Sequence, residues 1–444
     1  MRLGKKDPSI VASAAERARP FSNPKDLATL IDSIKDARVV MLGEASHGTE
    51  EFYYWRRQIS AELIKNHGYR FIVVEGDWPP AWKLNAYVHG NGPARTAREA
   101  LRGFHRWPTW MWANHEVVEL ASWLRAHNDT LPPEQRAGFY GLDVYSLFES
   151  IGAILKQLEP YPFLARKARV RYECFGRFNE DETAFARSLL QFPEGCEQQA
   201  LLSLQELLAA RLNEPAALAP FQDRLFDAEQ NARTVANAER YYRAMMHGTE
   251  DSWNVRDQHM QETLEALLQR YGSDAKAIVW AHNTHIGDYR ATSMQEEGQV
   301  NIGGLARERL GADQVKLVGF GTYRGEVTAA GAWDGAVETM RVPEARSDSY
   351  ESVLHEAAAH LKAPNIFLTF PKHRSPDDPL DTVLGHRAIG VVYRPAYERL
   401  GNYVPTSLAK RYDAFLFLDE TSALRPLDQT FNRAEIPETW PQGF

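Results

Sequence analysis

Four short apolar segments of this sequence each stop at a residue that can carry chemistry, and this pattern narrows the choice of fold. They are residues 39–42, 69–75, 138–143 and 276–280. Uninterrupted apolar runs of this length are typical of strands buried on both faces. Helical patterns near 24–34, 50–67 and 114–128 separate or precede them. Because strand, helix and strand in this order make parallel neighbours, we predict an α/β fold with a mainly parallel sheet flanked by helices.

Residues 146–272 follow a different pattern. Leucine and alanine recur there at helical spacing, and no strand-like run interrupts them. We predict that this stretch is a helical insertion into a single domain spanning residues 1–444. After it, the apolar pattern predicts further strands of the same sheet at 315–320, 366–370, 388–393 and 414–418.

Charge and apolar run length argue against two classes of partner. A net charge of −8 is unlike the basic footprint of a nucleic-acid-binding protein. The longest apolar runs are too short to span a membrane, and residues 1–20 lack the apolar core of a signal peptide. Cys174 and Cys196 are expected to form neither a disulfide framework nor a metal-binding knuckle. We expect a cytoplasmic protein, and the sequence predicts no oligomeric state.

Acidic and histidine side chains gather where the predicted strands end. They are Glu44 and His47, Glu75, Asp143, and His282 with His285. The carboxyl ends of parallel strands meet at one edge of a sheet. We therefore expect one solvent-connected cleft that holds Glu44, His47, Glu75 and His282. A carboxylate beside an imidazole is the arrangement that orients a general base.

The helix after the first strand adds a cation to this cluster. Helical side chains lean toward the helix N-terminus, so the guanidinium of Arg56 is expected to point back at Glu44 and His47. It could hold a substrate carbonyl, a carboxylate product or a developing oxyanion. Thr49 stands directly before the helix and is expected to cap it.

Two familiar motifs are excluded, and one alternative stays open. Ser46 is one residue out of place for the G-x-S-x-G turn of serine hydrolases. Residues 319–325 approximate a dinucleotide-binding loop, but the third glycine is displaced and no helix follows, so we predict a turn. A catalytic metal stays open as an alternative, with the ligands Glu44, His47, Glu75 and His282, although none of the dense metal-binding spacings is present.

Tryptophans crowd the segment 106–112, which includes Trp107 and Trp110. At this density they could line a cleft for a bulky apolar substrate. Packing beneath long loops would require the same residues, and both interpretations stay open.

Three separated motifs together resemble the erythromycin esterase family, in its broad esterase-like branch. They are G-E-A-S-H-G-T-E at 43–50, the strand that closes on Glu75, and W-A-H-N-T-H-I at 280–286. Residues 141–143 and 256–260 also look like family landmarks, and the similar motif order runs from about 38 to 328. The resemblance implies an α/β hydrolase with a helical insertion. It further implies that His47 is the general base, supported by Glu44 and Glu75, with Arg56 and His282 completing a site that needs no metal or other cofactor.

We therefore predict a hydrolase whose partner is a small-molecule ester or lactone, of which a macrolide is one candidate. Substrate binding is assigned to Trp107, Trp110, Asp143, Arg256 and His285. Two alternatives are a metal-dependent hydrolase that uses the same cluster and a non-catalytic binding protein. A protein that only binds would have no need of Glu44, His47, Glu75, Arg56 and His282 together.

Overall fold

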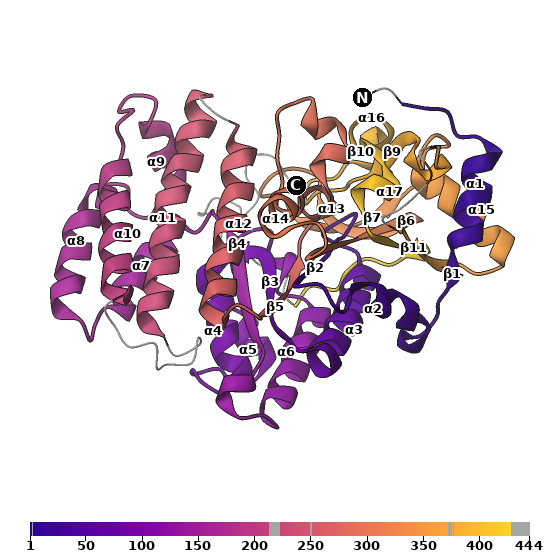
Figure 1. Ribbon diagram of the computed structural model, residues 1–444. Helices are drawn as coiled ribbons and strands as arrows, with labels where there is room; N and C mark the ends of the chain where they lie inside the picture. The colour runs from indigo at the N-terminus through magenta and orange to yellow at the C-terminus, as the bar shows by residue number, and fades with distance from the viewer. Residues whose placement is uncertain (2, 213–222, 249–250, 372–374, 376, 428–444) are drawn as a thin grey trace.

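The computed structural model describes residues 1, 3–212, 223–248, 251–371, 375 and 377–427. A central sheet is flanked by helices, and a group of helices stands at one side of it (Figure 1). Six neighbouring strands are mutually parallel, in the order β11-β6-β2-β5-β3-β4. Their bounds are β2 (Val39–Leu42), β3 (Tyr69–Asp77), β4 (Gly138–Asp143), β5 (Lys276–Trp280), β6 (Val315–Ala330) and β11 (Ala414–Thr421). The predicted fold class is confirmed.

Antiparallel strands complete the sheet at one edge. β8 (Asn365–Thr369) pairs with β11, and the short β1 (Arg19–Pro20) pairs with β8. β7 (Val337–Val342) pairs with the distal half of β6. The predicted strands 366–370 and 414–418 therefore lie in this sheet, the first of them antiparallel to its neighbour.

The apolar run of β2 divides its side chains between two cores. Val40 and Leu42 pack in the core beneath α2 (Ala28–Ile34), α3 (Glu50–His67) and α6 (His115–Asn128), whereas Val39 and Met41 pack in the core on the opposite face. Helices on that second face are α1 (Pro8–Arg17), α12 (Ser252–Tyr271), α14 (Ile302–Leu310) and α15 (Tyr350–Leu361). A strand covered on both faces needs apolar side chains at every position, which explains the absence of alternation.

The order of the strands brings the site together. β5 lies between β2 and β3, although it follows both of them in the chain. Leu42 of β2 and Val74 of β3 both pair with Trp280, the last residue of β5. The next residues along these three strands therefore emerge side by side at one edge of the sheet.

Between β4 and β5 the described chain is helical, as predicted. The helices are α7 (Leu147–Gln157), α8 (Pro162–Gly176), α9 (Glu182–Ser188), α10 (Glu197–Leu212), α11 (Arg224–His247) and α12. They form the group at the left of Figure 1 and have an apolar core of their own. α12 is the innermost of them and packs against β4.

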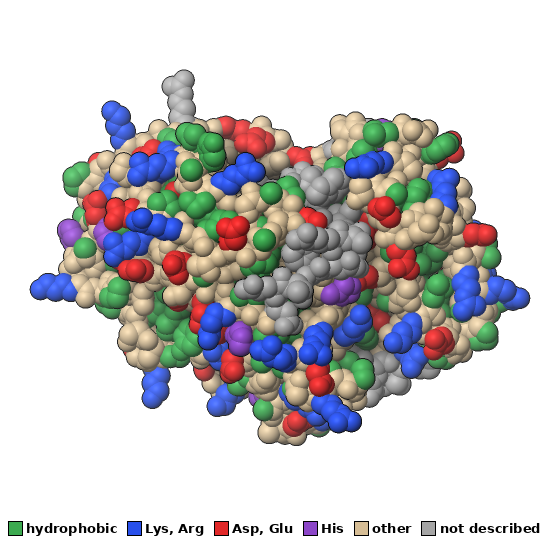
Figure 2. All heavy atoms as spheres, turned by 180° about the vertical axis from the view of Figure 1, so that it is seen from behind, with side chains coloured by type: hydrophobic (Ala, Val, Ile, Leu, Met, Phe, Trp, Pro, Cys, Tyr) green, Lys and Arg blue, Asp and Glu red, His purple; other side chains and the backbone are tan. Residues whose placement is uncertain are grey.

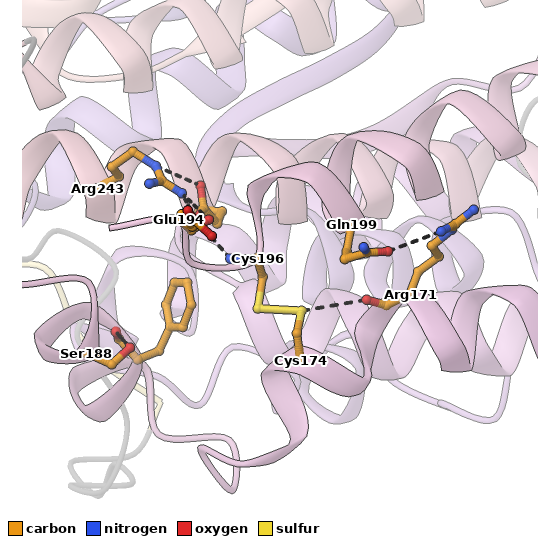
Figure 3. Close-up of a disulfide and its surroundings, with 9 residues drawn as sticks. Arg171, Cys174, Ser188, Glu194, Cys196, Gln199 and Arg243 are labelled. Atoms are coloured by element: carbon orange, nitrogen blue, oxygen red, sulfur yellow. Dashed lines mark hydrogen bonds and ion pairs between the residues drawn. A yellow bond between two sulfur atoms is a disulfide. The ribbon is translucent and has the colours of Figure 1, made fainter. Parts of the chain in front are cut away.

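The prediction for the two cysteines was wrong. Cys174 of α8 and Cys196, directly before α10, form a disulfide with their Cα atoms 6.0 Å apart (Figure 3). α8 packs against α10 in the core of the insertion, and this contact brings the two sulfurs together. A cysteine count contains no information on such distances.

Within the described residues, no helix has both the length and the apolar character that crossing a membrane requires.

Two other sequence predictions were also wrong. Residues 388–393 are not a strand of the main sheet: β9 (Val383–Arg387) precedes them and pairs with β10 (Tyr403–Ser407) in a separate two-stranded sheet. Residues 319–325 are not a turn but the middle of β6. Their glycines are needed because the ring of Phe415 lies over this strand, where a Cβ at Gly319 or Gly321 would meet it at 2.7 and 2.8 Å.

Acidic and basic side chains are interspersed over the described part of the face in Figure 2. Several of the large apolar side chains that remain exposed belong to the insertion: Phe163, Val170, Leu190, Phe192, Leu201 and Leu212. Charge of both signs is ordinary for a protein surface, and Lys and Arg side chains gather along the lower part of this view.

Gly48 should be intolerant of any side chain. Its carbonyl accepts hydrogen bonds from Thr328 N at 2.9 Å and Leu424 N at 2.8 Å, and an added Cβ would lie 1.8 Å from the Thr328 carbonyl oxygen. We expect Gly48→Ala to lower the free energy of unfolding by about 1–3 kcal/mol, the usual effect of overpacking. Denaturant unfolding measures this.

Gly152 provides the matched control. It is exposed in the middle of α7, and nothing lies within 4 Å of an added Cβ. Gly152→Ala should leave stability unchanged or raise it by up to about 1 kcal/mol, because alanine favours a helix. Equal effects of the two substitutions would contradict the close approach at Gly48.

Candidate active site

The turn after β2 presents a carboxylate, an imidazole and a guanidinium that contact one another. His47 Nδ1 donates to Glu44 Oε1 at 3.0 Å, and Arg56 Nη2 donates to Glu44 Oε2 at 2.7 Å. The orientation expected for Arg56 is therefore present. Thr49 occupies the position before α3, but its side chain makes no capping hydrogen bond and instead contacts the Ser46 hydroxyl, contrary to the sequence prediction.

Arg56 is held between two aromatic rings. Its Cζ atom lies 4.3 Å from the ring centroid of Tyr53 and 4.7 Å from that of Trp280, positions typical of cation–π contacts. Nε and Nη1 have no hydrogen-bond partner among the described residues. One edge of the guanidinium thus donates to Glu44, and the three N–H groups on Nε and Nη1 have no partner in the described part of the chain.

His282 follows β5 and caps α13 (Asn283–Ile286). Its Nδ1 accepts from the Thr284 hydroxyl at 2.7 Å and from the Thr284 amide at 3.3 Å. Its ring centroid is 5.0 Å from that of His47. Both Nε2 atoms are buried, and neither has a hydrogen-bond partner in the part of the chain that the structure describes.

Burial holds the pKa of His282 well below its ordinary value, and the neighbouring His47 lowers it further. The ring is therefore neutral at neutral pH. Because Nδ1 accepts hydrogen bonds from Thr284, the remaining proton is on Nε2. His282 thus carries an Nε2–H donor with no hydrogen-bond partner among the described residues, on a ring whose centroid lies 5.0 Å from that of His47.

Glu75 lies near the end of β3, two residues before Asp77, and contacts the main chain of His282. Its Oε2 accepts from His282 N at 2.8 Å, and its Oε1 accepts from Arg256 Nη2 at 2.7 Å. Burial alone would raise the pKa of Glu75, but His285, Arg256 and His47 together hold it well below the ordinary value. Glu75 is therefore an ionised group that fixes the site and is not a proton donor at neutral pH.

Three residues assigned to substrate binding form a buried ion network with Glu75. Arg256 donates to Asp143 through Nε at 2.9 Å and through Nη2 at 2.7 Å. His285 Nε2 lies 3.4 Å from Glu75 Oε1. All are at most 2% exposed. All of these contacts join one protein side chain to another. The substrate-binding role of Asp143, Arg256 and His285 therefore stays a prediction.

Asp257 is the residue that sequence reasoning missed. Both its oxygens accept from His285 Nδ1, at 3.0 and 2.9 Å. The segment 256–260 stands out in the sequence, but nothing there indicates that the acid next to Arg256 meets a histidine beyond β5.

Trp107 and Trp110 are fully buried and pack edge-to-face with their ring centroids 5.5 Å apart. Trp107 also contacts Trp333 and donates from Nε1 to the Gly335 carbonyl at 3.1 Å. These contacts favour the packing interpretation. Trp112, from the same segment, does reach the site, because its Nε1 donates to the Glu75 carbonyl at 3.0 Å.

The structure brings Glu44, His47, Glu75 and His282 together, as predicted, but each is at most 1% exposed. The expected solvent-connected cleft is therefore replaced by a closed site. No group of three or more His, Cys, Asp or Glu among the described residues is arranged to hold a metal. Oxygens of Glu44 and Glu75 accept hydrogen bonds from arginine side chains and from the main-chain amide of His282.

Comparisons with known proteins agree with this architecture. The chain is 24% identical to erythromycin esterase type II of Escherichia coli over 341 residues, which cover 70% of this chain and 75% of the relative. It is 22% identical to the putative hydrolase YbfO of Bacillus subtilis over 321 residues, 68% of each chain.

Solved structures share the fold. A protein from Bacillus cereus has a TM-score of 0.76 at 20% identity, with 94% of this chain and 98% of that chain covered. A succinoglycan biosynthesis protein has a TM-score of 0.75 at 19% identity, covering 95% and 100%. A mutant erythromycin esterase in its open conformation has a TM-score of 0.60 at 17% identity, covering 97% and 98%.

The sequence model of the family described as erythromycin esterase matches residues 64–421. The match begins after Arg56, so it does not include the motif at 43–50, while Glu75, Asp143, Arg256 and His282 all lie inside it. With well over half of the chain matched, this protein belongs to the erythromycin esterase family.

Proposed function

We propose that this protein hydrolyses an ester or lactone bond with a water molecule that His47 activates as general base. Family membership supports a hydrolase of this type. The observation that carries the proposal is the pair of buried Nε2 atoms, on His47 and His282, that have no partner among the described residues. Buried polar atoms are nearly always hydrogen-bonded, so such a pair favours a site built for water or substrate.

Glu44 gives His47 the tautomer that a base requires. Because Nδ1–H donates to the Glu44 carboxylate, the lone pair of the neutral ring is on Nε2. Arg56 holds the second oxygen of that carboxylate and so keeps it in place. A hydrogen bond from one ring nitrogen to a carboxylate orients the histidine of other general-base pairs in the same way.

His282 supplies the complementary group. Its Nε2–H can donate to the oxygen of a water whose proton points to His47 Nε2. As that oxygen bonds to the carbonyl carbon, His47 takes the proton. When the tetrahedral intermediate collapses, the leaving alkoxide receives this proton from the His47 imidazolium.

Arg56 would stabilise the charge that develops on the carbonyl oxygen. Its unpartnered Nη1–H and Nε–H are donors in a buried site, where a fixed cation acts more strongly than in water. Closure around the reacting groups also excludes bulk water. The closed arrangement requires an opening for substrate, and the open conformation named for a solved relative supports this.

The substrate class is a small-molecule ester or lactone. The name of the Escherichia coli relative makes a macrolide lactone the first compound to test, and at 24% identity other esters have equal standing.

His47→Ala should lose about 10²–10⁴-fold in kcat, the usual contribution of a general base. An ester and lactone panel measures this loss, and adding a chelator to the assay should leave the wild type unaffected.

His355→Ala is the matched control, since His355 lies on α15 and pairs with Asp419. It should keep wild-type turnover. Near-native turnover of a folded His47→Ala protein on a hydrolysed substrate would contradict the proposal. Chelator-sensitive activity restored by zinc or manganese would instead support the metal-dependent alternative.

Thr284→Val should test the role of His282 without removing its ring. The substitution deletes the hydroxyl that donates to Nδ1 and leaves the weaker amide contact. We expect kcat to fall about tenfold, in line with one lost hydrogen bond, while KM stays within about twofold. Steady-state kinetics on the best substrate decides; an unchanged kcat would show that the His282 tautomer is not set by Thr284.

A further inference from the structure

We propose that Asp257 of α12 is a positioning residue for hydrolysis, acting through His285 and Glu75 on the main chain of His282. The inference rests on the function proposed above for His282. It assigns a role to a residue of the helical insertion that does not contact the reacting groups.

Three consecutive contacts connect Asp257 to His282. Asp257 holds His285 Nδ1 at 2.9 Å, His285 Nε2 lies 3.4 Å from Glu75 Oε1, and Glu75 Oε2 accepts from His282 N at 2.8 Å. These residues come from α12, α13 and β3. All are at most 1% exposed.

The first part of this connection has a fixed geometry. Ile302 N, at the start of α14, donates to Asp257 Oδ1 at 2.8 Å. The Trp253 ring stacks on the His285 ring, with centroids 4.3 Å apart and an interplanar angle of 6°. The imidazole therefore cannot turn without breaking its hydrogen bond to Asp257 and its stacking on Trp253. Its Nε2 stays directed at Glu75.

The charges around His285 favour a protonated ring that donates on both sides. The groups that face it are the carboxylates of Asp257 and Glu75, the Arg256 guanidinium, whose Nη1 lies 3.1 Å from Nε2, and the neutral His282. Burial lowers the pKa of His285, and Arg256 lowers it too, but Asp257 and Glu75 outweigh both and raise it to about 9.

Loss of the Asp257 charge reverses this balance. Burial and Arg256 would then favour the neutral ring, whose Nε2 would keep the Arg256 contact already present at 3.1 Å as an acceptor and would carry no proton toward Glu75. Glu75 would lose a counter-charge and the His282 amide would be held less firmly. The catalytic imidazole is thereby displaced without any change to its own contacts with Thr284.

Asp257→Asn is the decisive substitution, because asparagine keeps the shape and can still accept from Nδ1. We expect kcat to fall about tenfold or more with little change in KM, as for misplacement of a catalytic group. The folded pKa of His285 lies above its ordinary value, so its contribution is complete at low pH and is lost as pH rises through about 9. The alkaline limb of kcat/KM should therefore move from about pH 9 toward neutrality. Asp257→Glu keeps a carboxylate and should therefore bring the alkaline limb part of the way back toward its wild-type position.

Asp419→Asn is the control, because it removes the carboxylate of another carboxylate–histidine pair, outside the site. It should leave the pH profile unchanged. A loss of kcat in Asp257→Asn with an unmoved alkaline limb would overturn the proposal, since a merely structural defect would give that result.

Nuclear magnetic resonance tests the inference independently of activity. In Asp257→Asn, the imidazole nitrogens of His285 should titrate at lower pH than in the wild type, and the amide proton of His282 should shift. Unchanged His285 titration and an unchanged His282 amide would overturn the inference even if no substrate were known. The same shifts in a protein that hydrolyses no ester would contradict only the proposed function.

Discussion

Glu75 connects the sheet, the helical insertion and the loop that carries His282, and its buried negative charge sets the arrangement of all three. Leaving one partner of a buried ion pair alone commonly costs about 3–5 kcal/mol, whereas an intact pair adds little net stability. The contacts of Glu75 with Arg256 and with the His282 amide therefore fix relative positions more than they hold the chain folded. Asp143 extends the same network to the end of β4.

The meeting of the site residues at the strand ends could be predicted, because the carboxyl ends of parallel strands lie at one edge of a sheet. The sequence did not indicate that β5 enters between β2 and β3, but any arrangement of neighbouring parallel strands would bring Glu44, Glu75 and His282 to one edge. The lean of Arg56 toward Glu44 followed from helix geometry alone. The closed state of the site could not be predicted, since it depends on the packing of segments far apart in the chain.

The predictions that failed concern contacts between distant residues. The glycines of 319–325 allow for the ring of Phe415, which lies on β11 nearly a hundred positions away. The apolar run 388–393 makes only isolated bridges, of Ile389 with Ser46 and of Val392 with Ala330. Asp257 escaped notice for the same reason, because its partner His285 comes from beyond β5.

α12 belongs to the insertion by chain order and to the active site by its contacts. It carries both Arg256 and Asp257, whereas α8 and α10 pack on the far side of the insertion and are tied together by their own disulfide. An engineer who wished to exchange the outer helices for those of another protein would have to keep α12 and its register against β4. α11 also contacts the main domain, because its Asp227 accepts a hydrogen bond from Trp78 Nε1 at 2.7 Å, so the exchangeable part is limited to outer helices such as α8 and α10.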